Sequence, residues 1–268
     1  MMTNQPNGRV IYRGSSLLDG APIVVIAIGF KSGSTNRKTG DMVQTYILRD
    51  DVAPTEAIKS GQDSSICGDC PHRGSVIAAP QPADSKTFTT RNVGRTCYVN
   101  VGQGPLAAWR TYKSGGYPDW DGTGVEGKFV RLGTYGDPAA VPASVWESLL
   151  KGSAGHTGYT HQWRSTEPTL QTHLAKLRSL CMASVDTVEE AREAARLGWR
   201  YFRVVIGRDP DQTTDLKESL CPASAEAGRK LTCNQCLACA GADGRRGSIY
   251  IPAHGGFAVM ANVRRKAA

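Results

Sequence analysis

From about residue 94 onward, short apolar runs alternate with amphipathic segments along the chain. The strand-like runs cover residues 95–101, 128–134, 159–163, 181–185, 201–206 and 248–251. Helix-like segments lie between most of them, at residues 142–151, at residues 168–180 and from residue 186 onward. Regular alternation of this kind predicts parallel strands joined by right-handed crossovers.

Residues 168–180 carry the clearest helical periodicity. Leu170, Leu174 and Leu177 recur at i, i+4 and i+7, which places them on one apolar face of a helix. This pattern predicts a helix that packs its leucine face against the sheet.

The next helix has a start and a stop in the sequence. Thr187 and Glu190 form a capping box, Ala191 and Ala195 supply a small-residue packing stripe, and Gly198 ends the helix. We expect this helix to separate the strand at residues 181–185 from the strand at residues 201–206.

The first part of the chain follows another pattern. Residues 23–28 and 42–48 read as two strands of a β-hairpin with a long polar connection, and residues 74–86 as a surface loop. We therefore predict two regions: residues 1–93, a β-hairpin region that bears a CxxC motif, and residues 94–268, a β/α domain. The predicted fold class is α/β, either a partial parallel β/α barrel of about six strands or an open parallel sheet.

Composition and charge narrow the function classes. The 268 residues are 40% hydrophobic, and no apolar stretch approaches the roughly 18–20 residues that span a bilayer. No segment reads as a secretory signal, so we expect a soluble, cytoplasmic protein with no membrane partner. The 32 Lys and Arg residues against 24 Asp and Glu give a net charge of +8, which suits nucleic acid or another polyanion as a partner but is equally a general feature of soluble proteins.

Eight cysteines carry the strongest chemical signal. Cys67 and Cys70 form a CxxC motif, and the last three form a CxxCxxC motif. Cysteines three positions apart converge on a metal more readily than they close a disulfide. The full set is Cys67, Cys70, Cys97, Cys181, Cys221, Cys233, Cys236 and Cys239.

The C-terminal cysteines provide four thiolates. Cys221, Cys233, Cys236 and Cys239 fit either zinc or an iron–sulfur cluster, and consecutive CxxCxxC spacing is more typical of iron–sulfur proteins. His254 is an alternative to Cys221 as the fourth ligand. Such a centre can be purely structural or catalytic.

The N-terminal cysteines provide three thiolates. Cys67, Cys70 and Cys97 would leave one iron of a 4Fe–4S cluster open to a substrate or to S-adenosylmethionine. Alternatively, His72 completes a structural Cys3His zinc site. Cys181 lies in an apolar run and is expected to be a buried core residue.

Polar residues follow several of the predicted strands. Asp137, His161 and Asp186 lie where the carboxyl ends of parallel strands should meet, and there they are candidates for proton transfer or substrate hydrogen bonding. Each has a structural alternative: Asp137 or Asp186 can cap the following helix, and His161 can be a core histidine.

Four further residues are candidates for binding a cofactor or substrate. Arg131 and Arg164 can hold a carboxylate or phosphate by two parallel hydrogen bonds. Trp163 or Tyr135 can stack on a nucleobase or an adenine ring. The sequence thereby predicts a ligand pocket at the strand ends.

The combined motifs resemble a known group of proteins. CGDC, Cys97-Tyr98, RLGTYGDP, GYTHQW, MASVD, CPAS and CxxCxxC together resemble uncharacterised proteins of phages and mobile elements. Those are distantly similar to radical-SAM-like phage proteins, which carry a Cys-Tyr pair at the third cluster cysteine inside a partial α/β barrel. The resemblance covers roughly residues 63–256. It implies that Cys67, Cys70 and Cys97 hold a cluster that binds S-adenosylmethionine, with Tyr98 beside it, and that the protein works in a host cytoplasm.

Three functions follow from these patterns. The first is an enzyme with one or two 4Fe–4S clusters that acts on a nucleotide, a nucleic acid or a small metabolite. The second is a zinc-containing barrel that modifies nucleic-acid bases, in which Cys233, Cys236, Cys239 and His254 hold zinc and the strand-end aspartates act as nucleophile and base. The third is a metal-stapled protein that binds nucleic acid or a host protein without catalysis.

Overall fold

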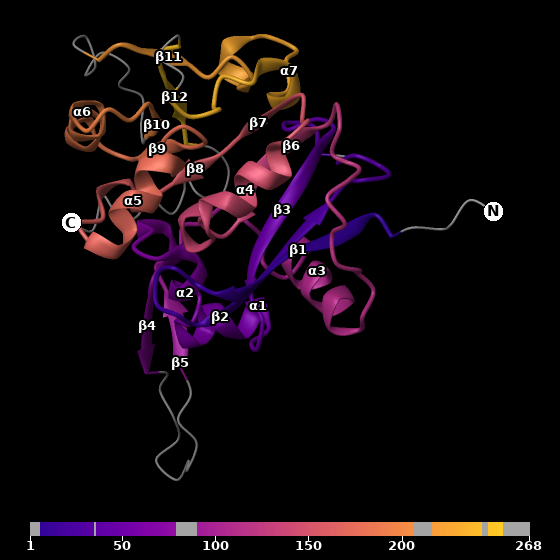
Figure 1. Cartoon of the computed structure of the whole chain (residues 1–268). Coiled ribbons are helices and arrows are strands. Elements are labelled where there is room, and N and C mark those ends of the chain that lie inside the picture. The colour runs from indigo at the N-terminus through magenta and orange to yellow at the C-terminus, as the bar shows by residue number, and fades with distance from the viewer. Residues whose placement is uncertain (1–5, 35, 79–89, 206–215, 243–245, 254–268) are drawn as a thin grey trace.

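The chain folds into a mixed α/β structure built on two five-stranded sheets. The computed structural model describes residues 6–34, 36–78, 90–205, 216–242 and 246–253. Figure 1 shows the N-terminal strands at the centre and the C-terminal elements at one end of the molecule. Parallel strand pairs occur in both sheets, and within the described residues they do not close into a barrel.

The first sheet joins the N-terminal region to the second half of the chain. Its strand order is β1-β2-β3-β6-β7, antiparallel from β1 to β3 and parallel from β3 to β7. The strands are β1 (Gly8–Ser15), β2 (Pro22–Ile28), β3 (Met42–Arg49), β6 (Phe129–Tyr135) and β7 (Gly155–Thr157). The hairpin predicted at residues 23–28 and 42–48 is confirmed, and its second strand pairs with β6 across the boundary predicted at residues 93 and 94.

The second sheet is parallel throughout. Its order is β11-β12-β10-β9-β8, with β8 (Tyr159–Thr160), β9 (Met182–Val185), β10 (Tyr201–Val205), β11 (Glu218–Leu220) and β12 (Ser248–Pro252). Only Gly158 separates β7 from β8, so the chain passes directly from one sheet into the other. The backbone of Gly158 donates to the Cys239 carbonyl at 3.0 Å and accepts from Met182 at 2.9 Å, which ties the second sheet to the last cysteine loop.

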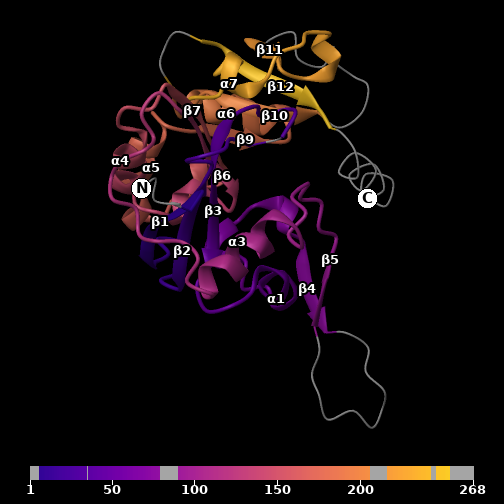
Figure 2. The same ribbon diagram turned by 90° about the vertical axis from the view of Figure 1, so that its right-hand side faces the viewer.

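Helices cover the sheets where the sequence places apolar faces. The helices are α1 (Pro54–Ser60), α2 (Ser64–Cys67), α3 (Gly104–Lys113), α4 (Ala143–Leu150), α5 (Pro168–Leu177), α6 (Val188–Arg196) and α7 (Cys233–Cys236). In Figure 2, α4 and α5 lie on one side of the first sheet, and α1 and α3 lie on the other. None of the helices within the described ranges is both long and apolar enough to cross a membrane.

The local predictions for α5 and α6 hold in large part. Leu170, Leu174 and Leu177 are all buried on one face of α5. Thr187 caps α6 by accepting from the backbone of Glu190 at 3.1 Å. The Glu190 carboxylate accepts a hydrogen bond from the backbone amide of Asp186, one residue before the predicted partner Thr187. The buried stripe of α6 consists of Ala191 and Ala194, at i and i+3, and Ala195 at i+4 is exposed, contrary to the prediction.

Three predicted segments differ in the structure. Residues 95–100 form no strand, because the amides of Thr96 and Cys97 pair with the His72 carbonyl instead of a neighbouring strand. Of residues 159–163, only the first two are strand, and η3 (Gln162–Arg164) is a 3-10 turn. Within the predicted loop at residues 74–86, β4 (Ser75–Ala78) pairs with β5 (Thr90–Val93), and residues 79–89 lie outside the described ranges.

The two cysteine-rich motifs lie toward different ends of the molecule. Figures 1 and 2 both place α7, β11 and β12 at the upper end and the β4–β5 hairpin in the lower part, and Figure 1 shows α2 next to this hairpin. The core between them is continuous, running from the central strands of the first sheet to Tyr201 in β10, with Trp146 of α4 as its largest fully buried side chain. The fold therefore holds the two motifs apart on one scaffold.

Candidate functional site

β6, β8 and β9 each end just before one of the polar residues predicted for proton transfer. Asp137 follows β6, His161 follows β8 and Asp186 follows β9. A carboxylate oxygen of Asp137 accepts the backbone hydrogen bond of His161 at 2.7 Å. The polar residues at these neighbouring strand ends therefore meet, as expected for parallel strands.

Asp137 is buried and fixed by backbone donors. Its Oδ1 accepts from Ala139 at 2.9 Å, which makes Asp137 the cap of η2 (Pro138–Ala140), as the structural alternative predicted. Burial raises the pKa of this carboxyl to about 6, although the amides of Ala139 and His161 act in the opposite direction. Asp137 is thus a carboxyl group that is half-protonated at about pH 6 and mostly ionised at neutral pH.

The CxxC motif lies on a short turn against these strand ends. Cys67 ends α2, and Gly68 adopts φ +52°. A Cβ atom at Gly68 would lie 2.5 Å from the side-chain nitrogen of Gln162, so only glycine allows this close approach. Gln162 donates from that nitrogen to the carbonyl oxygen of Cys67 at 3.3 Å. The motif is therefore anchored to the segment that follows β8.

Cys97 joins the CxxC motif through the backbone. The amides of Thr96 and Cys97 both donate to the carbonyl of His72, at 3.1 and 3.0 Å. Burial raises the pKa of the Cys67 thiol well above its ordinary value and that of Cys70 to about 12, and Cys97 adds to both shifts. Cys97 therefore lies near enough to act on both cysteines of the CxxC motif. Cys67, Cys70 and Cys97 are here called the first thiol group.

Two histidines face the first thiol group in different ways. His161 Nε2 lies 3.8 Å from Cys70 Sγ, and burial lowers the pKa of this imidazole to about 4. His72 instead contacts Thr96 Oγ1 at 3.0 Å and Asp186 Oδ2 at 3.0 Å, with its ring edge-on to His161. His161 Nε2 therefore lies beside Cys70, while the ring nitrogens of His72 contact Thr96 and Asp186. Zinc ligation by His72 stays a prediction.

A buried polar network that the sequence did not predict lies beside Cys67 and Cys97. Asp63 is fully buried and forms ion pairs with Arg73 at 2.9 Å and with Arg95 at 3.5 Å. Both terminal nitrogens of Arg95 and the hydroxyl of Tyr135 are buried, with no hydrogen-bond partner among the described residues. Arg95 and Tyr135 belong to the same electrostatic environment as the Cys67 thiol.

The four C-terminal cysteines form a second thiol group. Cys221 follows β11, Cys233 and Cys236 begin and end α7, and Cys239 lies in the next turn. Burial raises the pKa of Cys239 to about 12, and Cys221, Cys233 and Cys236 act on it in the same direction. His254, the alternative fourth ligand, lies outside the described residues.

The loop before β3 holds this second group in place. The amides of Cys233 and Asn234 donate to the carbonyls of Lys38 and Thr39 at 3.0 and 3.1 Å. The side chains of Thr232 and Gln235 form a capping box at the start of α7. The CxxCxxC motif is therefore a preformed turn fixed to the hairpin connection.

An arginine with two tyrosines lies between the thiol groups. Arg131 donates to the Tyr98 hydroxyl at 2.9 Å, and its guanidinium carbon lies 5.7 Å from the Tyr159 ring centre. Tyr159 in turn hydrogen-bonds Cys239, while Tyr98 directly follows Cys97 and is 73% exposed. Burial acts to lower the pKa of Arg131, but Tyr98, Tyr159 and Cys233 act against it, and the pKa is raised overall.

Of the other predicted ligand-binding residues, Tyr135 and Trp163 are buried and Arg164 is exposed. Tyr135 and Trp163 are 2% and 4% exposed, and Trp163 Nε1 donates to the Ser184 carbonyl. Arg164 forms an ion pair with Glu190 and lies over the Trp163 ring. The predicted stacking and anion-binding roles of these three residues stay predictions, and Tyr98 is the exposed ring next to the first thiol group.

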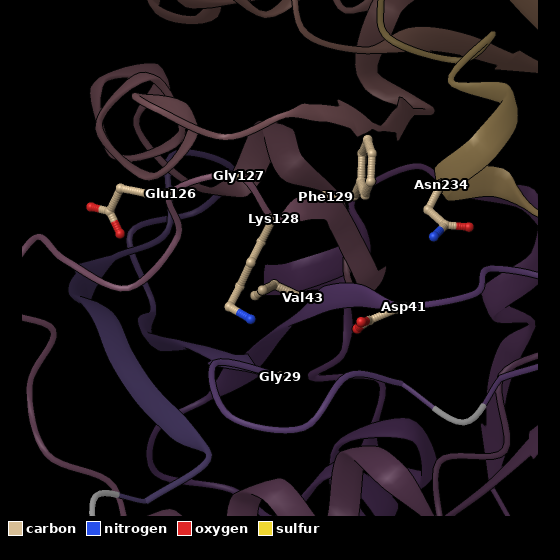
Figure 3. Close-up of a pocket in the computed structure, with 8 residues that line it drawn as sticks. All are labelled: Gly29, Asp41, Val43, Glu126, Gly127, Lys128, Phe129 and Asn234. Atoms are coloured by element: carbon tan, nitrogen blue, oxygen red, sulfur yellow. The ribbon is translucent and has the colours of Figure 1, made fainter.

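A cavity of about 290 Å³ lies at the opposite ends of the strands from Asp137 and His161. It opens at the amino ends of β3 and β6 and adjoins α7 through Asn234, as Figure 3 shows. Its walls carry two carboxylates, Asp41 and Glu126, and the ammonium group of Lys128. None of the residues predicted for catalysis or ligation lines this cavity.

The side chains in the described ranges include no three His, Cys, Asp or Glu that together have the geometry to hold a metal ion. Ligation at either thiol group therefore requires its sulfurs to approach one another further. Comparisons of the chain with models of protein families, with curated proteins and with solved structures gave no match.

Sequence reasoning missed the residues that support the first thiol group. Asp63, Arg73 and Arg95 lie outside the residues predicted for the site, and Gln162 lies in the GYTHQW motif without a predicted role; their partners lie elsewhere in the chain. The one local signal is the presence of Arg95 two residues before Cys97. A cation beside a ligand cysteine commonly supports its thiolate form.

Proposed function

We propose that this chain is an iron–sulfur enzyme whose catalytic cluster is held by Cys67, Cys70 and Cys97. The observation that carries the proposal is the contact between His161 Nε2 and Cys70 Sγ at 3.8 Å, at the carboxyl end of a parallel strand. Cys97, 30 residues from Cys67 along the chain, supports it by acting on the Cys67 and Cys70 thiols. In an α/β fold, the carboxyl ends of parallel strands are where ligands bind. In this proposal the parallel strands from β3 to β11 act as a partial barrel with the cluster at its mouth.

The chemistry of the donor set fits an inorganic centre. Burial disfavours the thiolate forms of Cys67 and Cys70, so an uncompensated pair would stay protonated. A bound cationic centre reverses this preference, because a coordinating thiol is deprotonated by the metal. The buried first thiol group is therefore suited to hold a metal centre rather than to serve as a solvent-exposed nucleophile.

The side chains around this group supply binding and proton transfer. Arg131 and the exposed ring of Tyr98 offer a guanidinium and an aromatic face to a substrate that carries a phosphate or carboxylate, such as a nucleotide. His72 with Asp186, and Asp137 with its raised pKa, can hold or move a proton. When bound, the cluster would supply electron transfer and, at an open iron, a position for S-adenosylmethionine.

The second thiol group is proposed to hold a further, structural metal centre that stabilises the C-terminal region. Its turn is anchored to the loop before β3 and to Gly158 at the junction of the sheets. Loss of this centre is expected to affect folding more than chemistry.

A zinc protein is the second candidate, because His161 lies 3.8 Å from Cys70 Sγ. Three thiolates and one imidazole form a closed tetrahedral zinc site. In that case the first group is structural, and the net charge of +8 favours nucleic acid as the partner, either bound or modified.

Metal analysis of anaerobically purified protein separates the candidates. An iron–sulfur enzyme is expected to be brown, to hold iron and sulfide, and to lose one of its two centres in Cys67→Ala, Cys70→Ala and Cys97→Ala. Cys181→Ala is the matched control, since Cys181 is a fully buried cysteine outside both groups. Colourless protein with stoichiometric zinc would support the second candidate, and unchanged iron content in all three variants would refute the assignment of the ligands.

A further inference from the structure

The cavity at the amino ends of β3 and β6 is separate from the site at Asp137 and His161. Its volume of about 290 Å³ is near the lower limit of the roughly 300–1,000 Å³ that is typical of small-molecule sites. Two of its wall residues, Gly29 and Gly127, have no side chain, and both adopt positive φ angles, of +121° and +68°, that favour glycine. The backbone here therefore leaves room for a ligand of the size of a single amino acid.

Two side chains of opposite charge line this cavity without pairing with each other. Figure 3 shows that the ammonium group of Lys128 and the carboxylate of Asp41 both extend toward the loop that carries Gly29. Within the described part of the chain, neither side chain forms an ion pair or a hydrogen bond. The cavity therefore offers a charged donor and a charged acceptor that are both available to a ligand.

The neighbouring loop and α7 hold two of the polar groups in place. A Cβ atom at Gly33 would lie 1.3 Å from Asp41 Oδ1, so the carboxylate takes the space that a side chain at residue 33 would occupy. Asn234 Oδ1 lies 2.5 Å from the Thr232 hydroxyl oxygen, and the amide nitrogen of Asn234 makes no hydrogen bond with another described residue. Figure 3 shows this nitrogen on the side of Phe129. Asn234 thus supplies a further donor.

The second carboxylate of the wall, that of Glu126, is already engaged. Its Oε2 accepts from the backbone amide of Gly124 at 2.8 Å, and in Figure 3 its carboxylate points away from Lys128 and Asp41. The charges left to a ligand are therefore one positive and one negative. A ligand that satisfies both carries one charge of each sign itself.

We infer that this cavity binds a free α-amino acid, with its carboxylate on Lys128 and Asn234 and its ammonium group on Asp41. Hydrogen bonds between charged groups at both ends are about twice as strong as neutral ones and fix the orientation of the ligand. The side chains of Val43 and Phe129 form the apolar part of the wall and would contact the side chain of the amino acid. This ligand is distinct from the substrate of the proposed enzyme, because the cavity lies at the opposite ends of the strands.

Isothermal titration calorimetry of the full-length protein tests this assignment. The probes are the twenty protein amino acids and, for the one that binds most tightly, the matching amine without the carboxylate and the matching acid without the amino group. At least one amino acid is expected to bind, and each analogue to bind about tenfold more weakly or less, because it lacks one charged end. Absence of binding by all twenty amino acids, or equal affinity of either analogue, overturns the inference.

Two site variants place the ligand in this cavity. Lys128→Met, which keeps the length of the side chain and removes its charge, and Asp41→Asn are each expected to weaken binding by about tenfold. Lys176→Met is the matched control, because Lys176 is an exposed residue of α5 that does not line the cavity. Should Lys128→Met fail to fold, Asp41→Asn still decides the question, since Asp41 is exposed. Amino-acid binding that neither Lys128→Met nor Asp41→Asn changes would place the ligand elsewhere and overturn the inference.

Discussion

Gly158 occupies the point at which the chain leaves the first sheet and enters the second. A Cβ atom there would lie 2.7 Å from Cys181 Sγ and 3.2 Å from Leu132 Cβ. Cys181 and Leu132 are both fully buried, so neither can move into solvent to make room. The absence of a side chain at this residue lets the two sheets approach each other.

Gly158→Ala is therefore expected to destabilise the protein by about 1–3 kcal/mol through overpacking. Urea unfolding measures the change, and Gly102→Ala is the control, because its nearest neighbour would lie 3.5 Å away. Cys181→Ala removes the closest atom, so the double variant should lose less stability than the sum of the two single changes. Additive losses would show that the thiol is not the obstacle.

At the level of elements, α6 shows a helix that is determined by its own sequence. Thr187 caps it, the Glu190 carboxylate accepts from the backbone amide of Asp186, and two alanines pack against the sheet. By contrast, residues 95–100 have a strand-like pattern and form no strand, because their amides reach the His72 carbonyl. A local sequence pattern predicts an element correctly where the element's own residues form its backbone hydrogen bonds. It fails where the hydrogen-bond partner of the backbone lies far away along the chain.

Thr187→Ala should lower the free energy of unfolding by about 1 kcal/mol, since it leaves the Glu190 amide without its cap. Thr111→Ala in α3 is the matched control: its hydroxyl bonds a carbonyl within the helix and caps no free amide. We expect that change to stay within about 0.5 kcal/mol of wild type. Equal losses in the two variants would contradict the capping role.

At the scale of the whole molecule, stability depends on pH through groups that folding buries. Burial lowers the pKa of His156, whose Nε2 contacts the Leu180 carbonyl between the two sheets. The unfolded chain then binds a proton near pH 6.5 more readily than the folded chain does. The contribution of His156 is therefore complete above that pH and is lost as the pH falls through the lower, folded pKa.

The difference in unfolding free energy between wild type and His156→Gln isolates this contribution. We expect the advantage of wild type to be largest at about pH 8 and to shrink by about pH 5, where folding must release the histidine proton. Denaturant unfolding across this range measures it, and the comparison with the variant cancels the opposite contribution of Asp137, whose pKa is raised. An advantage that stays constant with pH would show that His156 does not titrate in this way.

The sequence by itself determined the elements and the chemical groups. The period of the leucines in α5, the cap of α6, the hairpin strands and the grouping of cysteines by spacing all depend on neighbours a few residues away. Such local preferences act in the same way whatever the rest of the chain does. This is why they could be read before the fold was known.

Only the tertiary structure decided which groups face each other. It placed His161 Nε2 3.8 Å from Cys70 Sγ, paired Arg95 with the buried Asp63, and buried the ring of Trp163. These contacts join residues separated by up to about ninety positions, and they follow from strand order and from the turn at Gly158. Spacing along a chain carries no information on such pairs, because the free energy that selects them comes from packing the two sheets together.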